Sequence, residues 1–174
     1  MAHLPYADLE HADALPLVQR IKAERGSVLH LYQMLLHSTP LAEGWLGFMT
    51  AVRQQLDLPA ALRELVIMRV AQLNGAPYEA QQHEPIALNV GVTPAQLAAL
   101  PQWAASEAFN ELERAVLQLC DTMTQQVQVP RAMLRAVQQQ LGDKQTVELV
   151  ATIASYNMVS RFLEALHIHG DDPR

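Results

Sequence analysis

The sequence has a single cysteine, Cys120, so it can form neither an internal disulfide nor a cysteine-rich metal site. It is also poor in aromatic residues (5%) and has only 7 glycines among its 174 residues, whereas alanine, leucine, glutamine and glutamate are plentiful. Sheets favour aromatic and β-branched residues, and helices favour the residues that are abundant here. The composition therefore predicts an all-α protein, and the length fits one domain over 1–174.

Basic residues are scarce as well. The chain has 12 Lys and Arg against 18 Asp and Glu, and the basic residues are scattered, so we expect no nucleic-acid partner. The longest uncharged stretch, residues 86–106, is interrupted by Pro94 and Pro101, and we expect no membrane span. The first residues carry acids and no apolar run of signal-peptide length, which predicts a cytoplasmic protein.

Proline and glycine divide the chain into helical segments. Proline is favoured in the first turn of a helix and glycine just past its end. With the polar residues that can cap helix starts, these signals predict helices over residues 16–25, 27–37, 40–55, 60–73, 77–89, a short segment from 94, 110–126, 130–141 and 143–168.

Two of these segments have almost no polar face. Residues 60–73 are apolar except at four positions, and residues 147–159 carry one charge, Glu148. Such helices lie in a core or in a subunit interface. We therefore expect a homo-oligomer.

The same two segments share a short pattern. Glu64-Leu65-Val66 recurs at 148–150, and His83 follows Glu64 by the same nineteen residues that separate His167 from Glu148. The recurrence is either chance or the trace of two pseudo-repeated helical halves, and the sequence leaves both interpretations open.

Three titratable residues are placed to converge around the turn at Asn74-Gly75. Glu64 lies ten residues before Asn74 and His83 lies nine after it, so a helix hairpin brings both to a similar height, about 13–15 Å from the turn. Glu79 and His83 are four residues apart and share a helix face. A histidine titrates near neutral pH, and a carboxyl group in an apolar helix pair can have a raised pKa. This set could therefore transfer protons in one pocket.

The region 58–100 resembles the carboxymuconolactone decarboxylase family. The resemblance rests on Arg63-Glu64-Leu65, the small-residue turn, His83 and Gly91-Val92-Thr93. The rest of the chain is similar to the alkyl hydroperoxidase D branch in helical layout and length. That branch uses a Glu, a Cys-x-x-Cys pair and a His as a proton relay. The resemblance implies an alkyl hydroperoxidase D-like helical bundle, usually a trimer or hexamer, with the Glu at Glu64 and the His at His83.

The two cysteine positions of that relay fall on Ala76 and Glu79. A peroxidase of this type attacks peroxide with one thiolate and resolves the product with a second thiol, so peroxidase-related activity is disfavoured. Many non-redox relatives have Tyr-Glu before the His, as Tyr78-Glu79 does here. Cys120 lies on an apolar helical stripe, and we expect it to be buried and inert.

These observations predict a cofactor-free lyase or isomerase that acts on a small organic acid or lactone. Glu64 would donate or accept the proton, and His83 would position the substrate carboxylate or share the proton. Glu79 would tune the charge of His83, and Tyr78 would hydrogen-bond the substrate. The resemblance implies catalysis without a metal, although Glu64, Glu79 and His83 have ligand chemistry suited to one. The alternative is a ligand-binding or assembly protein in which these residues are structural.

Overall fold

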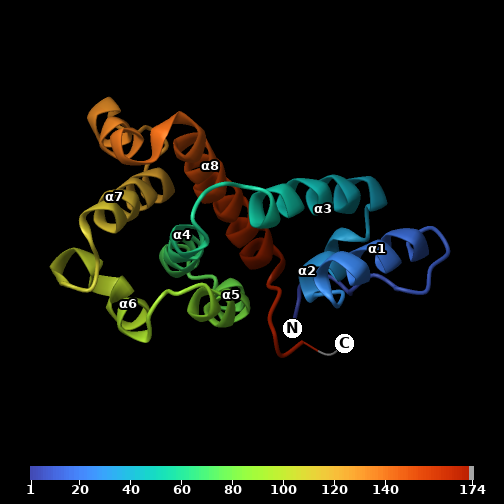
Figure 1. Cartoon of the computed structure of the whole chain (residues 1–174). Coiled ribbons are helices and arrows are strands. Elements are labelled where there is room, and N and C mark those ends of the chain that lie inside the picture. The colour runs from blue at the N-terminus through green and yellow to red at the C-terminus, as the bar shows by residue number, and fades with distance from the viewer. Residues whose placement is uncertain (173–174) are drawn as a thin grey trace. The chain divides into compact units, whose positions relative to one another are not determined.

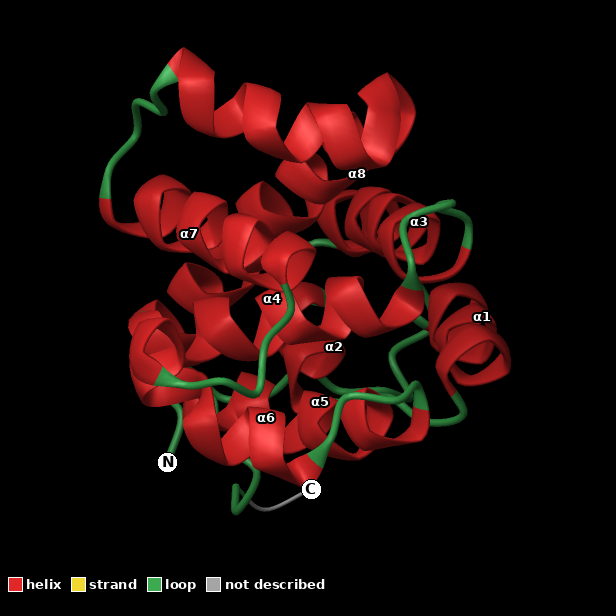
Figure 2. Ribbon diagram, turned by 60° about the vertical axis from the view of Figure 1, so that its left-hand side comes forward, coloured by secondary structure: helices red, strands yellow, loops and turns green. Residues whose placement is uncertain are grey.

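The computed structural model describes residues 1–172, and over that range it consists of helices and loops with no strand (Figure 2). This confirms the predicted all-α class. The elements are α1 (Leu15–Arg25), α2 (His30–Leu35), α3 (Thr39–Gln54), α4 (Ala60–Leu73), α5 (Pro77–Asn89), α6 (Pro94–Ala99), the 3₁₀ helix η1 (Leu100–Ala105), α7 (Glu111–Gln125) and α8 (Arg131–Leu166). Within the described residues, no helix is long and apolar enough to cross a membrane.

The chain forms two compact units. One comprises Met1–Gln55 and the segment that begins at Leu163, and here α1 and α2 pack against α3. The other, Leu56–Phe162, contains α4 to α7, η1 and most of α8. In this second unit α5 and α7 both pack against α4 (Figure 1). The single domain over 1–174 stays a prediction.

The α4–α5 hairpin has the boundaries that proline and glycine predict. Pro59 directly precedes α4, and Pro77 is the first residue of α5. Proline has no N–H and a fixed φ, both of which suit the first turn of a helix. Between the helices, Gly75 has φ +62°, a backbone conformation that glycine adopts at little cost. Local sequence is therefore enough to place this hairpin.

Other predicted helix boundaries agree with the structure only in part. Thr93 and Asn110 cap α6 and α7, each in a reciprocal pair of hydrogen bonds with the residue three positions on. The helix predicted from Ser27 is shorter and starts at His30, without a side-chain cap. The 3₁₀ helix η1 was not predicted. Gly142, with φ +74° and ψ 174°, interrupts α8 where a break is predicted.

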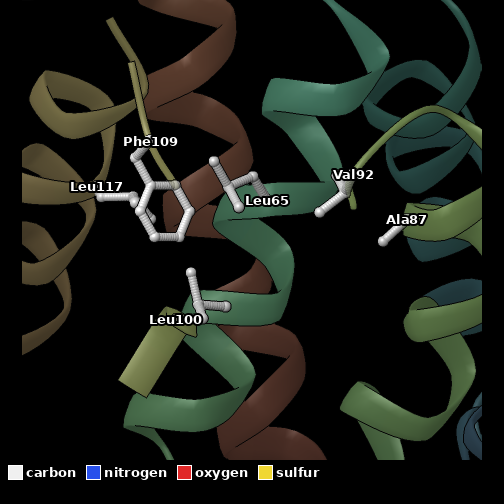
Figure 3. Packing of buried hydrophobic residues seen from close by; sticks show 6 residues of the cluster. All are labelled: Leu65, Ala87, Val92, Leu100, Phe109 and Leu117. Atoms are coloured by element: carbon white, nitrogen blue, oxygen red, sulfur yellow. The ribbon is translucent and has the colours of Figure 1, made fainter. Parts of the chain in front are cut away.

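The core of the second unit explains why α4 lacks a polar face. In Figure 3, Leu65 of α4 lies between Phe109 on one side and Val92 on the other. Most apolar side chains of α4 are buried in the chain itself: Leu62, Leu65, Val66, Ile67, Val70 and Ala71 are each at most 7% exposed, and the other four are half-buried. Burial of α4 therefore needs no second subunit.

An ion pair between buried Arg69 and half-buried Asp121 links α4 to its neighbours. Arg69 on α4 donates from Nε and Nη2 to the two carboxylate oxygens of Asp121 on α7, at 2.7 and 2.8 Å. Trp103 of η1 donates to the same carboxylate at 3.0 Å. Arg69 also donates to the carbonyl of Leu100, so its charge is paired and hydrogen-bonded. This network fixes α4 relative to η1 and α7.

Candidate functional site

Glu64 and His83 meet on the inner side of the α4–α5 hairpin. The Nδ1 atom of His83 lies 2.7 Å from Oε2 of Glu64, and the two residues are 6% and 1% exposed. Their similar distances from the turn, ten and nine residues from Asn74, predicted this approach, and the geometry confirms it. Their functional role stays a prediction.

A second group holds the carboxylate of Glu64. Arg63 donates from Nε to Oε1 of Glu64 at 3.1 Å. Burial acts to raise the pKa of Glu64, but the hydrogen bond from His83 and the charges of His83 and Arg63 outweigh it, so the pKa lies below its ordinary value. The idea of a raised carboxyl pKa was therefore wrong for Glu64, because His83 and, to a smaller extent, Arg63 stabilise its carboxylate. Glu64 is ionised at neutral pH.

An ionised Glu64 orients the imidazole of His83. A carboxylate only accepts hydrogen bonds, so Nδ1 of His83 carries the hydrogen in this contact. The nitrogen at which His83 gains or loses a proton is then Nε2. The ring of Tyr156 from α8 packs edge-on against the imidazole, with centroids 5.1 Å apart and an interplanar angle of 89°. Glu64 and Tyr156 together hold the ring in one orientation.

Glu79 is hydrogen-bonded to a different residue, Ser160 of α8. The Ser160 Oγ lies 2.5 Å from Oε2 of Glu79 and 3.0 Å from the carbonyl oxygen of Tyr156. Glu79 is 2% exposed and Ser160 is fully buried. Tyr78 is also buried, at 5% exposure. Its hydrogen bond to a substrate stays a prediction.

Sequence reasoning missed both residues from α8. Tyr156 and Ser160 are four residues apart and so lie on one helix face. Polar side chains at this spacing in a nearly uncharged helix are the signal that could have found them. The signal shows that they share a face, but not which helix the face meets.

The thiol of Cys120 lies in the core of the chain. Cys120 is fully buried, and its Sγ lies 3.7 Å from the carbonyl oxygen of Val66. Burial raises the pKa of the Cys120 thiol, and the charge of Asp121 adds to the effect. The family resemblance places Ala76 and Glu79 at the positions of the thiol pair, and neither side chain carries sulfur. The Cys120 thiol is thus buried and disfavoured as a thiolate.

The second copy of the Glu-Leu-Val pattern does not reproduce the site. Glu148 accepts a hydrogen bond from the backbone N–H of Leu58 at 2.8 Å. His167 lies just beyond the end of α8 and is exposed, with φ +55°. Neither has the burial or the partners of Glu64 and His83.

Metal binding at the hairpin would need several ligand side chains grouped closely together. Over residues 1–172, no three His, Cys, Asp or Glu side chains are grouped so that they could hold a metal ion. An open depression in the second unit has a volume of about 430 Å³ and is lined by Ala98, Ala99, Pro101, Gln102, Ala105 and Ser106. It lies on α6 and η1, so the pocket expected at Glu64, Glu79 and His83 stays a prediction.

The α4–α5 hairpin lies in a region that is similar to known proteins. Residues 39–122 match the model of the Carboxymuconolactone decarboxylase family, and this range includes Glu64, Glu79 and His83. The uncharacterized protein YdfG of Bacillus subtilis (strain 168) is 27% identical over 115 residues, which is 65% of this chain and 78% of YdfG.

Two solved structures share the fold. An uncharacterized peroxidase-related protein from Ralstonia eutropha JMP134, described as an alkylhydroperoxidase AhpD core, has a TM-score of 0.83 at 15% identity and covers 98% of this chain and 93% of its own. A variant of the debrominase Bmp8, in complex with 2,3,4-tribromopyrrole, has a TM-score of 0.78 at 18% identity and covers 96% and 92%. At these identities the likeness concerns the fold alone.

Proposed function

We propose that this chain, whose residues 39–122 match the model of the Carboxymuconolactone decarboxylase family, catalyses acid–base chemistry on a small organic acid or lactone, either decarboxylation or isomerisation. The observation that carries the proposal is the 2.7 Å hydrogen bond between buried Glu64 and His83. A glutamate with a structural role alone does not need a histidine as its hydrogen-bond partner. Proton transfer near neutral pH does favour a histidine, because the imidazole titrates in that range.

His83 is the group that exchanges a proton with the substrate. Its Nδ1–H is held by Glu64, so Nε2 accepts the proton when the imidazole is neutral and donates it when the imidazole is charged. The negative charge of Glu64 stabilises the imidazolium form. Glu64 thus acts on the substrate through His83, as a positioning and charge-stabilising group.

In a decarboxylation, the carbon–carboxylate bond of the substrate breaks and carbon dioxide leaves. The electron pair remains on the substrate, delocalised onto a conjugated carbonyl of the acid or lactone. His83, as imidazolium, delivers its proton to the carbon and becomes neutral, and a proton from solvent restores it. Isomerisation uses the same group, because His83 removes a proton from one carbon and returns it to another.

The other two predicted residues belong to the same hairpin. Glu79 lies one helical turn before His83, and Tyr78 directly precedes Glu79 at the start of α5. In the proposed site Tyr78 hydrogen-bonds the substrate. Glu79 tunes the charge of His83.

The test measures carbon dioxide release and loss of ultraviolet absorbance from carboxymuconolactone and a panel of small unsaturated lactone acids. Glu64→Gln keeps the shape of the side chain and removes its charge, and His83→Gln removes the imidazole. We expect each to lower kcat by about 100-fold or more, the usual contribution of acid–base catalysis.

Glu148→Gln is the matched control. It makes the same substitution in the repeated Glu-Leu-Val pattern, at a carboxylate that accepts from the backbone of Leu58. We expect it to keep wild-type turnover. If Glu64→Gln kept turnover as well and only lowered the melting temperature, Glu64 would be structural, and the assembly or ligand-binding alternative would be favoured.

A further inference from the structure

Arg63 is a mostly buried cation that uses only part of its hydrogen-bonding capacity. Its side chain is 12% exposed, and its Nε donates to Oε1 of Glu64 at 3.1 Å. A guanidinium carries further N–H donors on Nη1 and Nη2. Over residues 1–172, the bond to Glu64 is the only hydrogen bond or ion pair of the Arg63 side chain. The N–H groups on both Nη atoms are therefore available to a ligand.

The other arginines of the second unit that are not exposed use these groups. Arg69 donates from both Nη atoms to acceptors that include Asp121. Arg114 donates from both Nη atoms to main-chain carbonyl oxygens of the segment 103–106. A buried donor without a partner destabilises a fold, because it has lost its hydrogen bonds to water. Arg63 therefore differs from both in a way that a bound acceptor would compensate.

Arg63 and His83 flank the same carboxylate. The Nε of Arg63 donates to Oε1 of Glu64, and Nδ1 of His83 donates to Oε2. The guanidinium and the imidazole are thus held on two oxygens that share one carbon atom. All three residues belong to the second unit. One small organic acid can therefore contact both the guanidinium and the imidazole.

The charges of these three side chains favour an anionic ligand. Glu64 carries one negative charge, and the guanidinium of Arg63 is always positive. When His83 is the imidazolium that the proposed decarboxylation uses, the three side chains together are positive. A carboxylate balances such a charge, and its two oxygens match the fork of N–H groups on a guanidinium.

His83 cannot hold that carboxylate itself. Its Nδ1–H is bonded to Glu64, and in the proposed reaction Nε2 gains and loses the transferred proton. An N–H that delivers its proton to carbon does not remain as a donor to a carboxylate. The bound carboxylate is also not the one that leaves, because its charge disappears as carbon dioxide forms. A cation bonded to the leaving group would stabilise the substrate more than the transition state.

We infer that Nη1 and Nη2 of Arg63 bind the carboxylate that the substrate keeps during the reaction, and that Arg63 thereby selects an acid over its neutral ester. The inference rests on the proposed function, because the reaction decides which carboxylate is kept. Arg63 then has two roles: Nε supports Glu64, and the Nη atoms position the substrate beside His83. Binding of the acid can be measured without turnover.

Isothermal titration calorimetry of the whole chain compares two probes, a butenolide that bears an acetate side chain and the methyl ester of that acid. The ester has the same ring but no charge. We expect wild type to bind the acid about 10- to 100-fold more tightly than the ester, the range for hydrogen bonds to a charged group. Arg63→Gln should lose this preference. Arg63→Lys should keep only part of it, because an ammonium lacks the planar fork.

Arg114→Gln is the matched control. It removes a half-buried guanidinium of the same unit whose Nη atoms bond to main-chain carbonyl oxygens, so it should keep the wild-type preference whatever it does to stability. If Arg63 only supported Glu64, Arg63→Gln would lower the melting temperature and still prefer the acid. That result would overturn the inference, as would a wild type that binds the acid no more tightly than the ester.

A second measurement does not depend on the folding of Arg63→Gln. NMR of the whole chain with ¹⁵N-labelled arginine follows the guanidinium signals, and the signal that is missing in Arg63→Lys identifies Arg63. Its Nη signals should shift when the acid is added and stay in place with the ester. Unmoved signals would contradict the inference. The turnover of Glu64→Gln and His83→Gln judges the proposed function separately, because binding of the acid at Arg63 requires no reaction.

Discussion

The imidazole Nδ1 of His83 donates to the Glu64 carboxylate across the α4–α5 hairpin, and Arg63 donates to the other oxygen of the same carboxylate. Glu64 is therefore ionised and buried, and its pKa lies below the ordinary value, since the two donors outweigh the effect of burial. This relationship determines which group in the proposed site can exchange a proton.

The first prediction concerns the pH dependence of stability. The pKa of Glu64 is lower in the folded chain than in the unfolded chain, so the unfolded state binds more protons in the window between the two values. The stabilisation from Glu64 is fully present above the unfolded value, about 4.3, and is lost as the pH falls through the folded value.

Urea unfolding at a series of pH values measures this effect. The difference in unfolding free energy between wild type and Glu64→Gln should be largest at neutral pH and should shrink below about pH 4.3. Glu148→Gln, whose carboxylate accepts only one described backbone bond, is the comparison. A Glu64→Gln difference that stayed constant with pH would show that its pKa is not lowered by folding.

The second prediction is that thiol-dependent peroxide reduction is absent. The family resemblance places Ala76 and Glu79 at the positions of the peroxidase thiols. The single thiol of the chain, Cys120, is buried with a raised pKa. Peroxide consumption with a dithiol reductant should equal the protein-free rate in wild type and in Cys120→Ser. Rapid turnover that disappeared in Cys120→Ser would contradict the prediction.

The third prediction is a homo-oligomer that uses an exposed face of α8. Because α4 is buried in its own chain, its apolar surface is no reason for subunits to associate. The helix α8, however, exposes Val147 at 68% and Met158 at 39%, and Ala154 is exposed between them at helical spacing. Light scattering at micromolar concentration should show a mass well above 19.3 kDa, and the family resemblance implies a trimer or hexamer.

The double substitution Val147→Glu and Met158→Glu places two charges on that face and should lower the mass. Val127→Glu is its control, because Val127 is 99% exposed in a loop outside α8 and should tolerate the charge. A mass of 19.3 kDa for wild type throughout the range would exclude the oligomer.

The fourth prediction concerns the break in α8. Gly142 has φ +74° and ψ 174°, a region that other residues occupy at a cost of about 1–3 kcal/mol. Gly142→Ala should therefore lower the unfolding free energy by about that amount. Gly44→Ala in α3 should instead raise it by about 0.5–1 kcal/mol, because Gly44 is helical and exposed.

Denaturant unfolding of both variants measures the two effects. A Cβ atom would meet no neighbour within 4 Å at either glycine, so the comparison separates backbone strain from crowding. Equal stability of Gly142→Ala and wild type would mean that the break relaxes without cost.

The amino-acid sequence alone determined the α4–α5 hairpin and the approach of Glu64 to His83. Both depend on local rules: proline and glycine place the helix ends, and a fixed rise per residue gives the two side chains the same height above the turn. The same local rules placed the break at Gly142. Where a local signal was weak, as at Ser27, the predicted boundary differed from the structure.

Only the tertiary structure decided the charge of Glu64 and the partner of Glu79. The pKa of Glu64 depends on competition between burial and two donors, and sequence spacing gives neither their distances nor their balance. Ser160 lies 81 residues from Glu79, and nothing in the local pattern of α8 indicates which helix its polar face meets. Packing also decided that α5 and α7 of the same chain cover α4. The sequence could not predict this, because any apolar surface can bury an apolar helix equally well.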